Sequence, residues 1–82
     1  MNNLLDFDKE EKGYKPFKIN RENIKANIGK KICYVDYVEP NRGTYFVRYG
    51  VIHSIRYSRL FLNDMEKEVD IRDIKQAGIE IA

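Results

Sequence analysis

Residues 44–57 read TYFVRYGVIHSIRY, and every second position of this run carries a bulky or apolar side chain. Those positions are Tyr45, Val47, Tyr49, Val51, His53, Ile55 and Tyr57. A period of two is the period of a β-strand, because successive side chains leave the pleated backbone on opposite faces. We therefore expect one long strand that covers a core with these side chains and turns Arg48 and Arg56 outward. Gly50, which lacks a side chain, is the expected position of a bend or bulge.

Other segments of strand-like composition lie on both sides of this run, and short turn sequences separate them. The segments are residues 32–38, 60–62, 68–69 and 79–81. Residues 32–38 carry apolar side chains at odd and even positions alike, so both faces of this strand look apolar. Residues 40–43 and 56–59 predict hairpin turns. Asp70 is expected to cap a single helical turn that ends at Gly78, just before the last strand.

A short helix is expected ahead of the strands, over residues 21–28. Asn20 is a suitable N-cap, because its side chain can accept a hydrogen bond from a free N–H group of the first turn. Ile19 and Ile24 occupy the two positions of a hydrophobic staple. Gly29 can adopt the left-handed conformation that ends a helix. Residues 17–82 are then predicted to form a single domain, with the strands in residues 30–81.

Residues 1–16 are expected to form a flexible tail. The charged run at residues 8–13 has no hydrophobic stripe and ends in glycine, so it buries too little apolar surface to order itself. Leu4, Leu5 and Phe7 are the apolar side chains just before this run. Two interpretations of them stay open: the segment docks on the domain, or it is a short motif that binds a partner.

The order of these elements resembles that of the SH3-like small β-barrels, over residues 29–81. The resemblance depends on five short strands with tight turns, on RLFLND at residues 59–64 and on VDIRDI at residues 69–74. It implies a mostly β fold with minor α content, in which a five-stranded SH3-like barrel has a single helical turn before its last strand. Barrels of this kind bind nucleic acids, bind peptides or act as scaffolds, so the resemblance implies binding without specifying the partner.

Length and composition limit the classes to which this chain can belong. Its 82 residues suffice for one small domain. The sequence has no run of about 18 apolar residues and no charged-then-apolar leader, so no membrane association is expected. The single cysteine, Cys33, fits a reducing compartment, and we therefore expect a cytoplasmic protein.

The charged residues are unevenly distributed, although the net charge is only +2. Residues 30–59 contain six basic and two acidic side chains, whereas residues 60–82 contain three basic and six acidic ones. The chain is thus basic in its middle and acidic toward its end, which indicates a two-signed surface rather than a uniformly basic one.

Catalysis and metal binding have little support in the sequence. His53 and Cys33 are the only histidine and cysteine, and both are expected to pack in the core rather than to form a nucleophilic pair. Two such residues are too few for a structural zinc site. Asp70 and Asp73 are explained by helix capping and the helix dipole. We therefore predict no enzymatic activity, no cofactor and no metal.

Basic and aromatic side chains in the middle of the chain are the best candidates for binding. The candidate binding surface consists of Lys30, Lys31, Arg42, Phe46, Arg48, Arg56 and Arg59. Tyrosine and arginine are favoured anchors in protein interfaces, whereas arginine forks also suit phosphates and an exposed aromatic ring can stack on a base.

Two functions follow from this surface. The first is a protein-interaction module that acts as a regulator, an accessory subunit or an inhibitor; so small a protein would suit a phage or another mobile element. The alternative is a barrel that binds DNA or RNA through the basic and aromatic face. A monomer and a homodimer through an exposed strand edge both fit the sequence.

Overall fold

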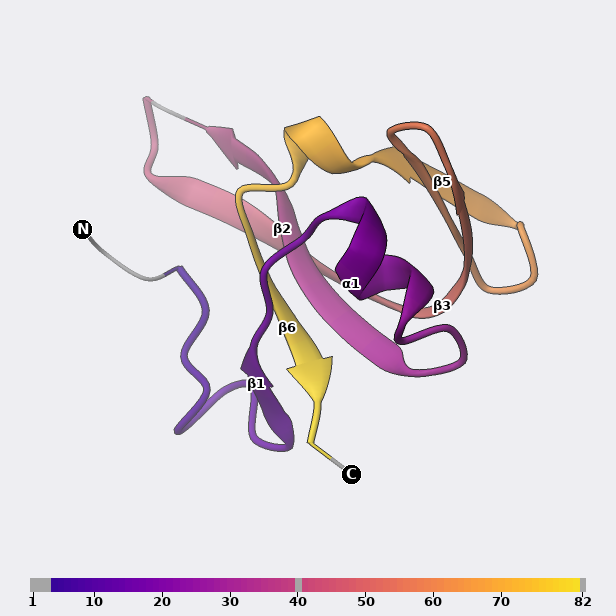
Figure 1. Ribbon diagram of the computed structural model, residues 1–82. Helices are drawn as coiled ribbons and strands as arrows, with labels where there is room; N and C mark the ends of the chain where they lie inside the picture. Colours follow the sequence, from indigo (N-terminus) through magenta and orange to yellow (C-terminus); the bar gives the residue numbers. More distant parts are fainter. Residues whose placement is uncertain (1–3, 40, 82) are drawn as a thin grey trace.

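The computed structural model describes residues 4–39 and 41–81, which form six β-strands, one short α-helix and one 3₁₀ turn (Figure 1). The elements are β1 (Tyr14–Pro16), α1 (Arg21–Lys25), β2 (Lys31–Glu39), β3 (Thr44–Arg56), β4 (Arg59–Leu62), β5 (Lys67–Asp70), η1 (Ile71–Asp73) and β6 (Gln76–Glu80). The predicted mostly β class and the helical turn before the last strand are confirmed.

The strands form one antiparallel sheet in the order β1-β6-β2-β3-β4-β5. The predicted closed barrel of five strands is therefore wrong, because the described residues form six strands and the sheet stays open. The additional strand is β1, in which Tyr14 pairs with Glu80 and Pro16 pairs with Gly78. Since β1 occupies the outer edge of β6, that edge cannot pair with β5 to close the sheet.

Strand β3 is the long strand that the alternating pattern predicts, and it is shared by the two halves of the sheet (Figure 1). It pairs with β2 as far as Val51 and with β4 from Ile52 onward. The pairing is irregular between Ile52 and Ser54, not at Gly50 as expected. Gly50 instead permits the close approach of the Leu62 side chain to the backbone of β3, because a Cβ atom at position 50 would lie 3.2 Å from Leu62 Cδ1.

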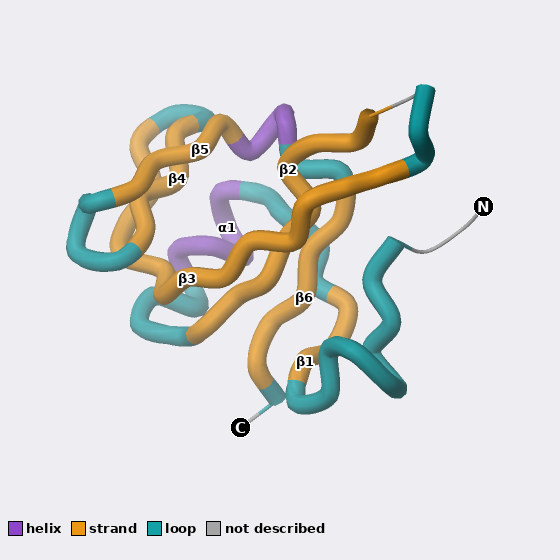
Figure 2. Tube along the Cα trace, turned by 180° about the vertical axis from the view of Figure 1, so that it is seen from behind, coloured by secondary structure: helices purple, strands orange, loops and turns teal. Residues whose placement is uncertain are grey.

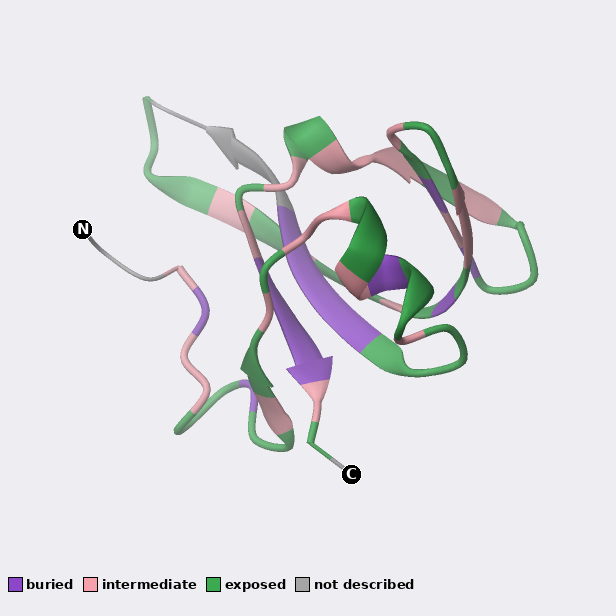
Figure 3. Cartoon of the chain, in the orientation of Figure 1, coloured by how far each residue is buried: buried purple, intermediate pink, exposed green. Residues whose placement is uncertain are grey.

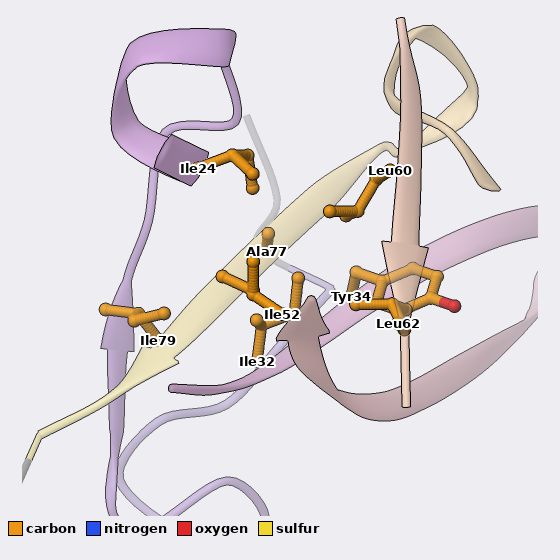
Figure 4. Packing of buried hydrophobic residues seen from close by; sticks show 8 residues of the cluster. All are labelled: Ile24, Ile32, Tyr34, Ile52, Leu60, Leu62, Ala77 and Ile79. Atoms are coloured by element: carbon orange, nitrogen blue, oxygen red, sulfur yellow. The ribbon is translucent and has the colours of Figure 1, made fainter. Parts of the chain in front are cut away.

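The main core lies between α1 and the concave side of the sheet (Figure 4). Its buried members are Ile24, Ile32, Tyr34, Ile52, Leu60, Leu62, Ala77 and Ile79. The expected core face of β3 is therefore only partly correct in the second half of the strand, because Ile55 packs against the main core but Val51 and His53 are exposed. Ile52 is 1% exposed, whereas Val51 is 37% exposed, Tyr57 is 78% exposed and His53 is exposed.

A second buried cluster covers the opposite face of β2 and β6, and residues from the N-terminal segment, residues 4–16, build it. Leu5, Cys33 and Val35 are its buried members. Leu4, Phe7, Tyr14, Tyr45 and Val47 pack around them. Figures 2 and 3 show the part of this segment before β1 running beside β1 and β6, on the side of the sheet away from α1. Residues 4–16 thus pack on the domain instead of extending from it as a flexible tail, which is the docking interpretation of Leu4, Leu5 and Phe7.

Gly78 lies in the middle of β6 and does not end the helical turn, as the sequence had suggested. It pairs with Cys33 on one side and with Pro16 on the other. A Cβ atom at this position would lie 2.5 Å from Phe7 Cε1 and 3.0 Å from Cys33 Sγ. The absence of a side chain at Gly78 therefore makes room for the Phe7 ring.

The predicted helix over residues 21–28 is not confirmed over that length, because α1 has only five residues and residues 26–29 form turns. Asn20 Oδ1 accepts a hydrogen bond from Asn23 N at 2.8 Å, which is the predicted cap. Asn27 N donates to Ile24 O, three residues back, so the backbone has left the α-helical pattern by that point. Gly29 follows at a φ of 92° and donates its N–H to Ile52 O, which starts the path into β2.

Candidate binding surfaces

The seven residues of the predicted binding surface are all exposed, but they occupy three separate places. The places are the start of β2 (Lys30, Lys31), the β2–β3 hairpin (Arg42, Phe46, Arg48) and the tip of the β3–β4 hairpin (Arg56, Arg59). The β2–β3 turn lies at the far end of β2 from Lys31, which pairs with Val51. Figure 1 shows the two hairpin tips on opposite sides of η1. Within the described residues these side chains do not form one continuous basic surface.

Phe46 and Arg48 lie together on β3, whereas Arg48 and Arg56, which were expected to point outward together, lie in different hairpins. The Arg48 guanidinium lies 5.4 Å from the centroid of the Phe46 ring, which is a cation–π distance. Phe46 is 48% exposed. The pair presents a flat aromatic and cationic surface on the β2–β3 hairpin.

The tip of the β3–β4 hairpin presents an aromatic side chain that the sequence pattern placed in the core. Arg56 pairs with Arg59, so Tyr57 and Ser58 are the two residues of the turn. Tyr57 has a φ of 56° and is 78% exposed. Arg59 NH1 lies 3.3 Å from Glu68 Oε2, an exposed ion pair that leaves this tip mixed in charge. The sequence did contain evidence that Tyr57 is exposed. Position 57 lies in a predicted turn directly after the strand, where alternation no longer decides the direction of a side chain.

Glu11 and Tyr49 connect the N-terminal segment to β3. The Tyr49 hydroxyl donates to the Glu11 carboxylate, with distances of 2.7 Å to Oε1 and 2.6 Å to Oε2. Glu11 is only 6% exposed, and the Tyr14 ring lies 6.2 Å from the Tyr49 ring. The hydrogen bond to Glu11, assisted by partial burial, raises the pKa of Tyr49 well above its usual value. Burial likewise raises the pKa of Tyr14.

This hydrogen bond predicts a specific loss of stability in alkali. Tyr49 titrates near 10 in the unfolded chain, whereas its pKa is higher in the folded protein. The resulting stabilisation is fully present below about pH 10 and is lost as the pH rises toward the folded pKa. Urea unfolding at a series of pH values from 8 to 11 measures this effect. The variant Tyr49→Phe should show a shallower decline above about pH 10 than the wild type; parallel curves would contradict the assignment.

Cys33 and His53 are not placed together as a nucleophilic pair. Cys33 is buried in the second cluster, and burial together with the Glu11 charge raises its pKa to about 11. His53 is exposed at the irregularity of β3, where Nδ1 lies 2.9 Å from Ser54 Oγ. The expectation that His53 packs in the core is therefore wrong: His53 shares the exposed face of Val51, whereas Ile52, on the opposite face of β3, is buried in the main core.

In the described part of the chain, no three His, Cys, Asp or Glu side chains are grouped so that they could hold a metal ion. None of its helices has the length and apolar character needed to cross a membrane. Comparison of the chain with protein-family models, curated proteins and solved structures found no match.

Proposed function

We propose that this chain is a non-catalytic module that binds another protein, with Tyr57 as its main anchor. The observation that carries this proposal is the exposed tyrosine at the tip of the β3–β4 hairpin, held at a φ of 56°. Such a module would act as a regulator, an accessory subunit or an inhibitor by covering a surface of its partner.

The backbone at Tyr57 supports a role in binding rather than in folding. A residue with a side chain costs about 1–2 kcal/mol in the left-handed region. Two-residue hairpin turns usually place Gly, Asn or Asp at such positions. Here the position holds a large aromatic ring that contributes little to the core, since 78% of it is exposed. Strain retained under an exposed side chain is typical of functional sites, and tyrosine beside arginine is typical of interface hot spots.

The distribution of charge favours a protein partner over a nucleic acid. A nucleic-acid footprint is usually a continuous basic patch or stripe. The basic side chains of this chain are divided among three places, and acidic groups lie next to two of them. Glu68 pairs with Arg59, and Glu80 Oε2 accepts from the backbone N–H of Lys31 at 2.6 Å.

Nucleic-acid binding remains the second candidate because of the Phe46 and Arg48 pair. A base could stack on the Phe46 ring while an arginine contacts a phosphate. A titration of the ¹⁵N-labelled protein with short mixed DNA and RNA, at low and moderate salt, separates the candidates. We expect no salt-sensitive shifts at these two amides; shifts that weaken as the salt rises would favour the nucleic-acid function.

We also propose that strands β2–β6 are an open form of the SH3-like arrangement. Three features support this assignment: the long β3 shared by both halves of the sheet, the 3₁₀ turn before the last strand, and the pairing of β6 with β2. The cytoplasm is the compartment we propose, because the lone buried thiol of Cys33 suits a reducing environment.

Replacing Tyr57 by glycine should separate binding from stability. Glycine relieves the left-handed strain, so the free energy of unfolding should stay unchanged or rise by up to about 1 kcal/mol. Loss of the aromatic anchor should lower retention of the partner at least about tenfold, the effect of a hot-spot residue. Quantitative affinity capture from the cells that make the protein measures this, with Tyr57→Phe as the matched control that keeps the ring. Equal recovery of the same proteins on the glycine variant would contradict the proposal.

A further inference from the structure

A groove runs along β3 beyond the point where the N-terminal segment stops covering it. Two adjoining hollows of 650 Å³ and 220 Å³ form this β3 groove, and Val51 lines both of them. Its walls come from the turn before β2, from β3 and from the β4–β5 turn, and Tyr14 of β1 and Lys31 of β2 line the smaller hollow. The side chains that matter below are Ile28, Tyr49, Val51, Asp64 and Glu66.

The floor of the β3 groove is apolar and uncovered. Ile28 is 55% exposed, Tyr49 is 51% exposed and Val51 is 37% exposed. Tyr45 and Val47 point from the same face of β3, and there the second cluster covers them. The N-terminal segment shows what fits this face: an irregular chain with leucine and phenylalanine side chains. Its contact with β3 ends at Tyr49, so the face continues into the groove without an occupant from the described chain.

One wall of the β3 groove is acidic. The Asp64 and Glu66 carboxylates make no ion pair with any residue that the structure describes. Lys31 lies at the opposite end, beside Tyr49. A ligand that places a cation near the two carboxylates gains electrostatic attraction, and one that places an anion there is repelled.

The acidic wall is attached firmly to the floor of the groove. Asn63 Oδ1 accepts from the Val51 N–H at 3.0 Å, and Asn63 N donates to the Val51 carbonyl at 3.0 Å. Asn63, Asp64 and Met65 have φ values of 52°, 58° and 70°, three consecutive left-handed residues. Such a run is unusual for residues other than glycine, and it defines the backbone of the turn that carries the two carboxylates.

We infer that the β3 groove binds a segment of a partner protein in which an aliphatic side chain is followed by lysine or arginine. The aliphatic side chain would contact Val51 and Ile28, and the basic group would lie near Asp64 and Glu66. This inference depends on the proposed protein-binding function, but it uses the end of β4 opposite to Tyr57, so the two sites can be tested separately.

A ¹⁵N chemical-shift titration with two capped peptides tests the inference. The first is Gly-Leu-Val-Lys-Lys-Gly, and the second replaces both lysines by glutamate. We expect the basic peptide to shift the amides of Ile28, Val51 and Glu66, and the acidic peptide to leave them unchanged. The double variant Asp64→Asn with Glu66→Gln should weaken the basic peptide about fivefold, since exposed ion pairs contribute little each.

Three results would overturn the inference: equal shifts with both peptides, no shifts with either, or shifts at the same amides on raising protein concentration without peptide. The last result would mean that a second copy of this chain occupies the groove. The variant Lys9→Ala, at an exposed position outside the groove, serves as the control, because it should bind the basic peptide as the wild type does. If the groove does not bind the basic peptide, the role of Tyr57 is still decided separately, by affinity capture with the Tyr57→Gly variant.

Discussion

Replacing Gly78 by valine is expected to lower the free energy of unfolding by about 3 kcal/mol and to release the N-terminal segment from the sheet. A side chain at this position meets Phe7 Cε1 at 2.5 Å, Cys33 Sγ at 3.0 Å and the backbone oxygen of Lys15 at 3.2 Å. The Phe7 ring can rotate away only by leaving the second cluster, and the Lys15 carbonyl can move only with β1. Urea unfolding followed by circular dichroism measures the loss of stability.

The thiol of Cys33 reports the release of the segment directly. It is fully buried in the second cluster and should react slowly with a thiol reagent in the native wild type. In Gly78→Val the reaction should become much faster below the denaturant concentration that unfolds the sheet. The matched test introduces Gly78→Ala into the Phe7→Ala variant and into the wild type. The loss of stability caused by Gly78→Ala should be smaller in the Phe7→Ala variant, because residue 7 is smaller there. Wild-type stability and a protected thiol in Gly78→Val would show that Phe7 does not lie over Gly78.

Replacing Leu60 by alanine should destabilise the whole domain by about 3 kcal/mol, because it leaves a cavity in the main core. Leu60 is 0% exposed and packs in the cluster that joins α1 to both halves of the sheet. A domain of 82 residues buries a limited core, so this loss is a large fraction of its total stability.

Leu5→Ala is the matched control for Leu60→Ala, since the same side chain is truncated at a site that is 3% exposed. Leu5 belongs to the second cluster, so its truncation should increase the reactivity of Cys33 while the main unfolding transition shifts less. Equal losses of global stability in the two variants, with Cys33 protected in both, would contradict the division into two clusters.

The strands from β2 to β6 could be predicted from the sequence, whereas β1 and the buried face of β3 could not. Alternation predicts a strand but does not say which face is buried when both faces meet other parts of the chain. Tyr45 and Val47 do face a cluster, but it is the one built by the N-terminal segment. Beyond Tyr49 this face is uncovered, so Val51 and His53 are exposed, while Ile52 and, after the register shift, Ile55 pack in the main core. No residue type in the sequence marks that shift. The informative signal was the apolar character of residues 32–38 at odd and even positions, which anticipates a strand covered on both sides.

The residue types of the candidate binding surface could be identified from the sequence. Their division among three places depends on how the strands pair, which the sequence does not show. Lys31 and Arg42 are close in the chain, but β2 carries them to opposite ends of its pairing with β3. Alternation grouped Arg48 with Arg56, which lie in different hairpins, although Phe46 of the same alternation does lie against Arg48. Tyr57 was assigned to the core because the alternating pattern was continued one position past the end of the strand.

Photocrosslinking at position 57 tests the proposed function most directly. Tyr57 is replaced by the photoreactive residue p-benzoylphenylalanine in the cells that make the protein, with the same residue at exposed Lys12 as the background control and at Phe46 as the nucleic-acid control. Our account predicts a discrete protein adduct from position 57 that resists nuclease and is absent from position 12. No adduct at position 57, or a nuclease-sensitive adduct at position 46 alone, would contradict it.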